Sequence, residues 1–241
     1  MFFDQDPFDV RCEWGLAGVE ALQPRSDAII VVDVLSFTTS VDIATSRGAV
    51  VLPYPWRDHD RATDFALMHR ALLARAGRRR SGSFTLSPES LLGISAGTRL
   101  VLPSPNGATL SLATGTVPTL AGCLWNAEVV ARAALQYGNR IGVIPAGEHW
   151  EHGGLRPGLE DLVGAGAIIH HLPGSRSPEA EAAVAAYRRF EDDLVDCLRH
   201  CGSGRELIGH GFARDVELAG QLNCSHCAPV LVDGAYVRQN E

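Results

Sequence analysis

Residues 27–39 read DAIIVVDVLSFTT, an apolar and β-branched run that ends at Asp33 and is followed by small hydrogen-bonding side chains. A run of this length with polar boundaries is typical of a strand that is buried on both faces. The residues that follow, Phe37–Arg47, have the spacing of a helix. A strand that passes through a short polar turn into a helix is the repeating unit of parallel α/β folds.

The same unit recurs along the first two thirds of the chain. The other runs that predict strands are Phe8–Glu13, Ala49–Pro53, Gly97–Pro103, Val117–Gly122 and Asn139–Pro145. The other segments that predict helices are His59–Ala76, Ala108–Ala113, Asn126–Gln136 and Glu160–His170. Because strands and helices alternate, we expect a mainly parallel sheet that is covered by helices on both faces.

The last quarter of the chain has a different pattern. Glu179–His200 is amphipathic and predicts one long helix, which two shorter helices follow at Arg205–His210 and Ala213–Gly220. Pro229–Val237, with Asp233-Gly234 at its centre, predicts a small hairpin. Since no linker-like stretch divides the chain, we expect a single domain over residues 1–241. Its helical C-terminal appendage would begin at about residue 175.

Composition and charge exclude several classes of protein. The chain has 241 residues and a net charge of −7, which argues against a basic surface for nucleic acid. No apolar run approaches the roughly 18 residues of a membrane span, and the acidic start Met1–Asp6 does not resemble a signal peptide. We therefore expect a cytoplasmic protein with reduced cysteines and no nucleic-acid or membrane partner. The basic segment Arg78–Ser83 predicts a solvated loop, and assembly into a homo-oligomer is left open.

Polar side chains follow four of the predicted strands, at the edge where open parallel sheets bind their ligands. The segments concerned are Asp33–Thr39, Ser104–Thr109, Gly122–Glu128 and Ala146–Glu148, and the next helix opens with Leu159–Asp161. Helix N-termini at such an edge attract anions. Carboxylates at the same edge can hold Mg²⁺, which binds one or two carboxylates together with phosphate oxygens. Anion donors beside a cation are what the cleavage of a phosphate ester needs.

Each of these residues also has a simpler structural interpretation. Ser, Thr, Asn and Asp are ordinary helix caps, Asn106-Gly107 has the composition of a turn, and Glu160-Asp161 suits the first turn of a helix. Asp33 is harder to explain in this way, because it ends an apolar run where an unpaired carboxylate is costly. The recurrence of polar residues at one edge favours a functional site.

At these positions the chain resembles the 2-phosphosulfolactate phosphatase family. The first matching segments are VVDVLSFTT (31–39), LSPE (86–89), SPNGAT (104–109) and NAEVVA (126–131). They continue with EDLVGAG (160–166), SGREL (203–207) and DVELA (215–219). Each segment is short, but they follow one another in the order of the family through most of the chain.

The resemblance implies a three-layer α/β/α fold and an enzyme, a phosphoric monoester hydrolase that uses Mg²⁺. Its substrate would be a small 2-phospho acid, 2-phosphosulfolactate, which is cleaved to sulfolactate and phosphate in coenzyme M biosynthesis. By their chemistry we assign catalysis and the metal to Asp33, Glu160 and Asp161. Substrate contacts are assigned to Thr38, Thr39, Asn106, Gly107, Thr109 and Asn126.

One departure from the family bears on the substrate. The chain has Ser36-Phe37 where the family has Arg-Ala, and an arginine there would be a natural bidentate partner for phosphate or sulfonate. Two alternatives therefore stay open, a phosphatase for a different small phosphate ester and a non-catalytic binder of an anionic metabolite.

Other constellations point to different chemistry but have simpler interpretations. His149 and His152 could bind a transition metal, yet they lie in a glycine-rich segment without the i,i+4 spacing of a zinc hydrolase. Cys224 and Cys227 have the C-x-x-C spacing of a zinc site, with Cys197 and Cys201 as further ligands. The upstream pair, however, lies on a predicted helix and suits packing.

Motifs of other phosphate-handling enzymes do not fit the chain. The segment Asp33–Thr38 lacks the second aspartate of haloacid-dehalogenase phosphatases, where Leu35 stands instead. Neither a P-loop nor a strand-borne G-x-G-x-x-G is present, so nucleotide binding lacks support.

Overall fold

The computed structural model describes residues 3–55, 59–75 and 83–239. Residues 78–82 of the predicted loop Arg78–Ser83 and the last residue of the predicted helix His59–Ala76 lie outside the described residues.

In the described residues, nine strands form one mixed sheet in the order β1-β7-β2-β6-β10-β11-β3-β5-β4. The strands are β1 (Val10–Cys12), β2 (Ala28–Val32), β3 (Val50–Pro55), β4 (Leu72–Leu73), β5 (Arg99–Ser104), β6 (Thr119–Gly122), β7 (Ile141–Pro145), β10 (Pro229–Val232) and β11 (Ala235–Arg238). Five of the strand pairings are parallel and three are antiparallel. The expected strands and the mainly parallel sheet are thus confirmed.

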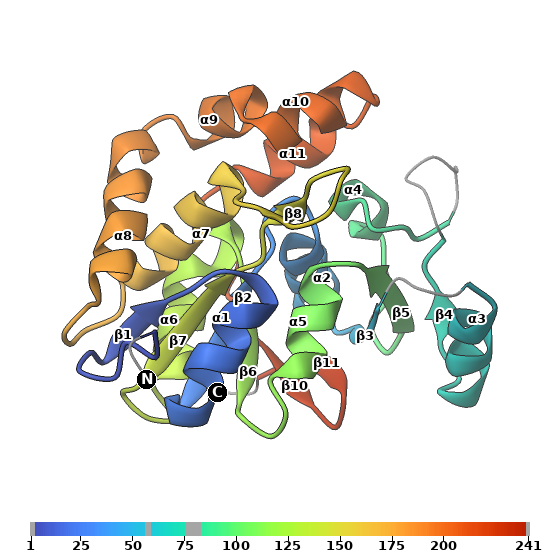
Figure 1. The fold of residues 1–241 in the computed structure, drawn as a ribbon. Coiled ribbons are helices and arrows are strands. Elements are labelled where there is room, and N and C mark those ends of the chain that lie inside the picture. The colour runs from blue at the N-terminus through green and yellow to red at the C-terminus, as the bar shows by residue number, and fades with distance from the viewer. Residues whose placement is uncertain (1–2, 56–58, 76–82, 240–241) are drawn as a thin grey trace.

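Helices cover the sheet on both faces, which gives the three layers of an α/β/α fold (Figure 1). On one face, Ile29 and Val31 of β2 pack against α1 (Gly15–Leu22) and α5 (Gly107–Ala113). On the other face, Ile30 and Val32 pack against α6 (Ala127–Ala134) and α7 (Leu159–His170). This two-sided burial is why β2 reads as a continuous apolar run rather than as an alternating one.

The predicted C-terminal hairpin exists, but it lies in the middle of the sheet. β10 pairs with β6 and β11 pairs with β3, both antiparallel. Tyr236 of β11 is fully buried, packs edge-on against Phe37 at 6.3 Å between ring centroids, and donates its hydroxyl to Ser111 Oγ at 2.7 Å. The tail of the chain is therefore part of the core.

The hairpin also changes the geometry of the sheet edge. Traced through the three antiparallel pairings, β3, β5 and β4 run opposite to β6. Each strand of a twisted sheet is rotated by about 20–25° relative to its neighbour, so the five steps from β2 to β5 add up to roughly 100–125°. A rotation of this size is compatible with the carboxyl ends of β2 and β5 lying close together. The loops after β2 and β5 do meet, through a hydrogen bond from Gly107 N to Asp33 Oδ2 at 2.9 Å.

The prediction of one long helix over Glu179–His200 is wrong. The structure has two helices, α8 (Pro178–Phe190) and α9 (Leu194–His200), separated at the acidic residues Glu191-Asp192-Asp193. Aspartate is a weak helix former that favours helix starts, and Asp193 precedes α9, where its carbonyl accepts from Cys197 N. The shorter helices α10 (Gly202–Gly209) and α11 (Ala213–Ala219) follow as expected. In Figure 1, α9, α10 and α11 lie together above α7.

The predicted helix over His59–Ala76 is too long. α3 spans His59–Met68, the chain turns at Arg70 with a positive φ of 50°, and the edge strand β4 follows. The remaining elements are α2 (Phe37–Ser46), α4 (Pro88–Leu91), the short hairpin of β8 (Glu148–His149) and β9 (Leu155–Arg156), and the 3₁₀ helices η1 (Gln23–Arg25) and η2 (Leu124–Asn126). Of these remaining elements, the sequence predicted only α2.

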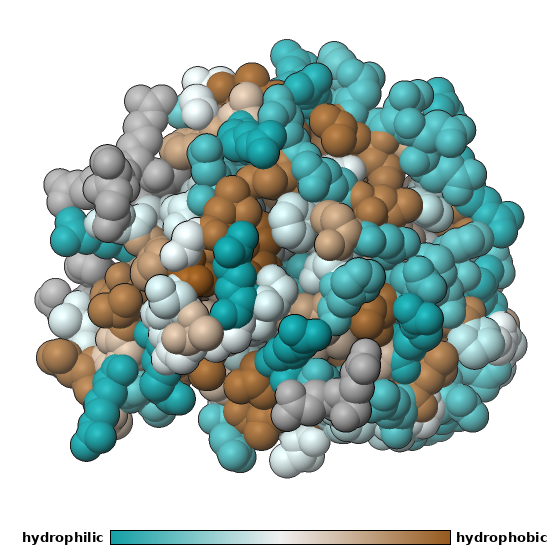
Figure 2. Space-filling model, turned by 180° about the vertical axis from the view of Figure 1, so that it is seen from behind, coloured by the Kyte–Doolittle hydropathy of each residue, from teal (hydrophilic) through white to brown (hydrophobic). Residues whose placement is uncertain are grey.

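The surface is that of a folded globular protein. Figure 2 shows the side opposite to Figure 1, where apolar side chains are interspersed with polar ones, as is usual for protein surfaces. Among the described helices, none has the length and apolar character that a membrane crossing requires.

Candidate active site

Asp33 connects the starts of two helices. Its side chain is buried, with Oδ1 accepting from Phe37 N of α2 at 3.2 Å and Oδ2 accepting from Gly107 N of α5 at 2.9 Å. Gly107 is required for this approach, since a Cβ there would lie 2.7 Å from Asp33 Oδ2 and would also collide with the Phe37 ring. The residues predicted at two separate junctions, Asp33 and Gly107, are thus brought together.

Asp161 makes an equivalent connection from the first turn of α7. Its Oδ1 accepts from Val34 N and its Oδ2 accepts from Gly147 N, each at 2.8 Å. Burial, followed by the charges of Glu160 and Asp33, raises the pKa of Asp161 well above its ordinary value. Asp33 and Asp161 together hold the loops after β2, β5 and β7 against one another.

Glu160, the neighbour of Asp161, faces the start of α10. Its Oε1 accepts from Ser203 Oγ at 2.6 Å and its Oε2 accepts a weaker bond from Cys201 Sγ at 3.4 Å. Ser203 Oγ also receives a hydrogen bond of 2.9 Å from Arg156 Nη2 on β9. The half-buried guanidinium of Arg156 is thereby linked to a buried carboxylate through one hydroxyl.

Glu148 is a site residue that we did not predict. It lies on β8, its Oε2 accepts from Asn106 Nδ2 at 2.9 Å, and Arg156 is its partner across the β8–β9 pairing. Burial and the charge of Asp33 raise its pKa to about 7, although the bond from Asn106 acts in the opposite direction. A signal was present in the sequence, because Glu148 follows the β7 strand much as Asp33 follows β2. Asp33, Glu148, Glu160 and Asp161 are called the carboxylate cluster below.

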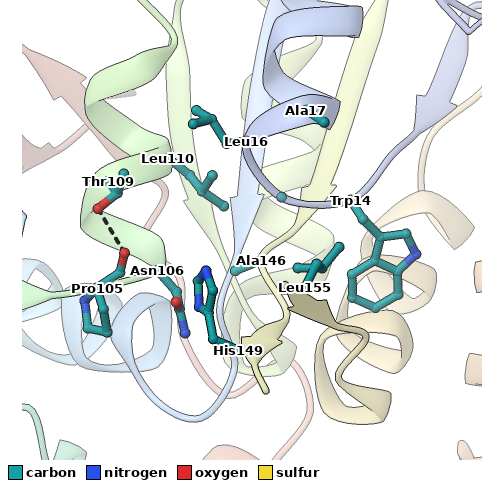
Figure 3. Close-up of a pocket in the computed structure, with 11 residues that line it drawn as sticks. Trp14, Leu16, Ala17, Pro105, Asn106, Thr109, Leu110, Ala146, His149 and Leu155 are labelled. Atoms are coloured by element: carbon teal, nitrogen blue, oxygen red, sulfur yellow. Dashed lines mark hydrogen bonds between the residues drawn. The ribbon is translucent and has the colours of Figure 1, made fainter. Parts of the chain in front are cut away.

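The three predicted threonines use their hydroxyls inside the protein. Thr38 Oγ1 donates to Asp33 O, Thr39 Oγ1 to Val34 O and Thr109 Oγ1 to Pro105 O, each at 2.8 Å. Thr38 and Thr39 are fully buried and shape the turn into α2, whereas Thr109 lines a cavity (Figure 3).

Asn126 lies in a different polar cluster from the other predicted site residues. Its Oδ1 accepts from Cys123 N at 2.9 Å, and its Nδ2 donates to Asp42 Oδ1 at 3.2 Å and to two backbone carbonyls. Ser225 Oγ donates to the same Asp42 oxygen at 3.0 Å. Asp42, Asn126 and Ser225, all buried, are called the Asp42 cluster below. The structure thus does not bring Asn126 into the carboxylate cluster.

Asn106 and Glu148, which are joined by a hydrogen bond, line two different cavities. The larger, of about 460 Å³, is bounded by the first turn of α1, by α5 and by His149, and Asn106 lines it (Figure 3). The smaller, of about 240 Å³, is lined by Glu148 and Ser203 together with side chains of α10 and the following turn. The hydrogen bond thus connects one lining residue of each cavity.

A metal ion at the carboxylate cluster would have to be one that needs few protein ligands. Among the described residues, no group of three histidine, cysteine or carboxylate side chains is arranged to hold a metal, and this includes the carboxylate cluster as well as His149, His152 and the cysteine pairs. Mg²⁺ needs only one or two protein carboxylates. The like charges that raise the pKa values of Asp161 and Glu148 are also those that a nearby cation would offset.

Comparisons with known proteins point to one family. The family model described as 2-phosphosulpholactate phosphatase matches residues 19–234, a range that includes the whole carboxylate cluster. A probable 2-phosphosulfolactate phosphatase of Carboxydothermus hydrogenoformans is 32% identical over 222 residues, which cover 87% of this chain and 89% of that protein. The 2-phosphosulfolactate phosphatase of Methanothermobacter thermautotrophicus is 31% identical over 211 residues, which cover 87% of this chain and 88% of that protein.

Proposed function

The chain belongs to the 2-phosphosulfolactate phosphatase family, and we propose that it hydrolyses 2-phosphosulfolactate to sulfolactate and phosphate at the carboxylate cluster. The observation that carries the proposal is the convergence of three loops on Asp33 and Asp161, beside Glu148 and two cavities. Mg²⁺ dependence, a role in coenzyme M biosynthesis and a cytoplasmic location are parts of the proposal that rest on the resemblance and on composition.

Arg156 is the arginine that we assign to the phosphoryl group. Position 36, where the family has arginine, is a buried serine in this chain. Arg156 offers a planar guanidinium beside the carboxylate cluster, held by Ser203 and lying 5.9 Å from the centroid of the Trp150 ring. A guanidinium binds a phosphate with two parallel hydrogen bonds. In this assignment the guanidinium of Arg156 on β9 binds the phosphate in place of the arginine that the family has at position 36.

Glu148 is the residue that we assign to proton transfer. It lines the smaller cavity, Asn106 fixes its orientation, and its pKa of about 7 lies near the operating pH, as an efficient general base requires. In its ionised form it would accept a proton from the attacking water and hold it at its carboxylate. Removal of that proton makes the water a better nucleophile at phosphorus.

Asp33 and Asp161 are the residues that would hold Mg²⁺. Each of their carboxylate oxygens accepts a hydrogen bond from a backbone N–H group, and a carboxylate oxygen can accept more than one bond. When bound, the ion would neutralise part of the charge on the phosphoryl oxygens. The two aspartates also fix the loops that carry Gly107 and Gly147, so the site is organised without a ligand.

The proposal is tested by measuring phosphate release from 2-phosphosulfolactate. Purified protein with Mg²⁺ should release one phosphate per substrate, and EDTA should abolish the release until Mg²⁺ is restored in excess. If the protein binds the substrate tightly but releases no phosphate at saturating substrate and Mg²⁺, the proposed phosphatase activity is wrong. That result would support the alternative suggested by Ser36-Phe37, a non-catalytic binder of an anionic metabolite. Turnover that persists in EDTA would contradict the metal assignment alone.

A further inference from the structure

Glu160 is a buried carboxylate that the proposed function does not use. Its side chain is 2% exposed and accepts from Ser203 Oγ at 2.6 Å and from Cys201 Sγ at 3.4 Å. Gly158 makes room for it, since a Cβ there would lie 2.6 Å from Glu160 Oε1. A buried carboxylate is costly unless its oxygens are hydrogen-bonded, so these contacts hold the side chain towards the start of α10.

The hydroxyl of Ser203 has a fixed direction because of Glu160. A serine hydroxyl has one proton, which it donates to one acceptor, and two lone pairs. The proton is directed to the Glu160 carboxylate, which makes this bond stronger than a neutral acceptor would. The lone pairs of Oγ are left for a donor, and Arg156 Nη2 donates to one of them at 2.9 Å. A carboxylate on α7 thus determines what the hydroxyl on α10 offers to β9.

Arg156 depends on this contact for its orientation. Among the described residues, Ser203 Oγ is the one hydrogen-bond acceptor of its guanidinium, and the Trp150 ring lies beside it with its centroid 5.9 Å from Cζ. An arginine side chain has many rotamers, and the loss of this freedom on binding opposes affinity. A guanidinium that is already held through one N–H group keeps four others for a phosphate.

We propose that Glu160 and Ser203 are positioning residues, which hold Arg156 in the orientation that binds the phosphoryl group. The inference rests on the proposed function, in which Arg156 is the phosphate ligand. It gives Glu160 a different role from the metal site that the sequence predicts, because the carboxylate acts on the substrate through Ser203 and Arg156. Ser203 also lines the smaller cavity, so a direct contact with the phosphate is the alternative that the experiment must exclude.

Ser203→Ala and Ser225→Ala form a matched pair of variants. Ser225 is buried, donates to Asp42 Oδ1 at 3.0 Å and accepts from Cys227 N at 3.1 Å. Each serine thus donates to a buried carboxyl group and accepts from one N–H group, but Ser225 lies in the Asp42 cluster. Both substitutions should lower the free energy of unfolding in urea, whereas a change in KM should be confined to Ser203→Ala.

We expect KM for 2-phosphosulfolactate to be about 3- to 10-fold higher in Ser203→Ala than in wild-type protein, the contribution of one hydrogen bond. The kcat should change little, because the guanidinium binds the phosphoryl group before the reaction as well as during it. Ser225→Ala should have the KM of the wild type. Equal KM values in Ser203→Ala and wild-type protein would overturn the inference.

A double-mutant cycle with Arg156→Ala separates positioning from direct contact. When the guanidinium is absent, Ser203→Ala should leave KM unchanged, although it still lowers the free energy of unfolding. If Ser203 contacted the phosphate itself, the effects of the two substitutions on KM would multiply. That result would contradict the positioning role.

Glu160→Gln tests the first of the two positioning residues. The amide still offers an oxygen to Ser203 but lacks the charge that strengthens the bond, so KM should lie between the values of wild-type protein and Ser203→Ala. A wild-type KM, or a loss of kcat in place of a rise in KM, would overturn the role of Glu160.

A further variant covers the case in which Ser203→Ala does not fold, since that substitution leaves the Glu160 carboxylate with fewer partners. The double variant Glu160→Gln/Ser203→Ala removes the charge, and a neutral amide costs less to bury without a partner. We expect its KM to be about 3- to 10-fold above that of wild-type protein. A wild-type KM in this variant would contradict the inference.

The inference can fail separately from the proposed function. If wild-type protein releases no phosphate from 2-phosphosulfolactate, the proposed function fails and calorimetric titration with inorganic phosphate replaces the kinetic measurement. Weaker binding of phosphate to Ser203→Ala than to Ser225→Ala would still support the positioning of Arg156. Equal binding to the two variants, or no binding to wild-type protein, would overturn it.

Discussion

The carboxylate cluster and the Asp42 cluster contain the same kind of group in different surroundings. Glu148 and Asp42 each have a pKa raised to about 7, and burial is the largest cause for both. Glu148 is half-buried, lines a cavity and has Asp33 as a charged neighbour. Asp42 is fully buried and receives hydrogen bonds from Asn126 and Ser225.

The difference shows that a shifted pKa does not by itself identify a catalytic group. Desolvation raises the pKa of any buried carboxyl, whether the site binds a substrate or only connects parts of the core. Access and neighbouring charge separate the two cases. The Asp42 cluster joins α2, η2 and the segment before β10, so we expect its disruption to affect stability and not turnover.

The largest effect is expected from Asp33→Asn, which should lower kcat/KM at least about 100-fold, or about 2.7 kcal/mol in barrier. The change removes a charge that we assign to Mg²⁺. It should also lower the free energy of unfolding by about 1–3 kcal/mol, because an amide can accept only one of the N–H groups of Phe37 and Gly107. Steady-state kinetics and urea unfolding measure both effects, and a folded variant with near-normal turnover would contradict the assignment.

Asn126→Ala disrupts the Asp42 cluster and should affect stability rather than turnover. The change leaves Asp42 Oδ1, Cys123 N and two carbonyls with fewer partners, which should lower the free energy of unfolding by about 2 kcal/mol. The kcat of the folded protein should stay close to the wild-type value. A loss of kcat without a loss of stability would return Asn126 to the substrate contacts that the sequence predicts.

Arg156→Lys should raise KM for 2-phosphosulfolactate about 10-fold while kcat changes little. Lysine keeps the charge but cannot hold Ser203 and also bind a phosphate with two parallel hydrogen bonds. Arg205→Lys, on the exposed side of α10, is the matched control and should leave KM unchanged. Identical KM values in the two variants would exclude Arg156 as the phosphate ligand.

A pH dependence of stability is expected from Asp42. Its pKa is about 7 in the folded protein and has an ordinary value of 3.8, so the folded state holds an extra proton between these values. Stability should therefore fall as pH rises through this range, by at most about 1.4 kcal/mol per pH unit, and level off above a pH of about 7. Urea unfolding of wild type and Asp42→Asn between about pH 5 and pH 8 measures it. Equal pH slopes in the two proteins would show that Asp42 does not cause the effect.

The strands and most helices could be predicted from the sequence because β2, β5 and β7 are buried on both faces and therefore continuously apolar. The place of β10 and β11 could not be predicted, since the pattern of a hairpin does not tell which strands it will join. The break between α8 and α9 was missed because Glu191, Asp192 and Asp193 continue the amphipathic pattern while favouring a new helix start.

The site was predictable where a residue directly follows a strand, as Asp33 does, or opens a helix, as Asp161 does. Asn126 also precedes a helix, yet its side chain turns inward to Asp42, and local sequence does not reveal that direction. Glu148 and Arg156 lie on a hairpin of two-residue strands that are too short for a periodic pattern. Their role depends on contacts with Asn106 and Ser203, which are distant in the sequence.

The central claim is that chemistry takes place at the carboxylate cluster, and Glu148→Gln compared with Asp42→Asn tests it most directly. Both substitutions replace a carboxyl whose pKa is about 7 by an amide of similar shape, and the amide oxygen introduced by Glu148→Gln can still accept the bond from Asn106. With Mg²⁺ and saturating 2-phosphosulfolactate, phosphate release should fall at least about 100-fold in Glu148→Gln and remain near the wild-type rate in Asp42→Asn. Equal rates in the two variants, or a greater loss in Asp42→Asn, would contradict the account.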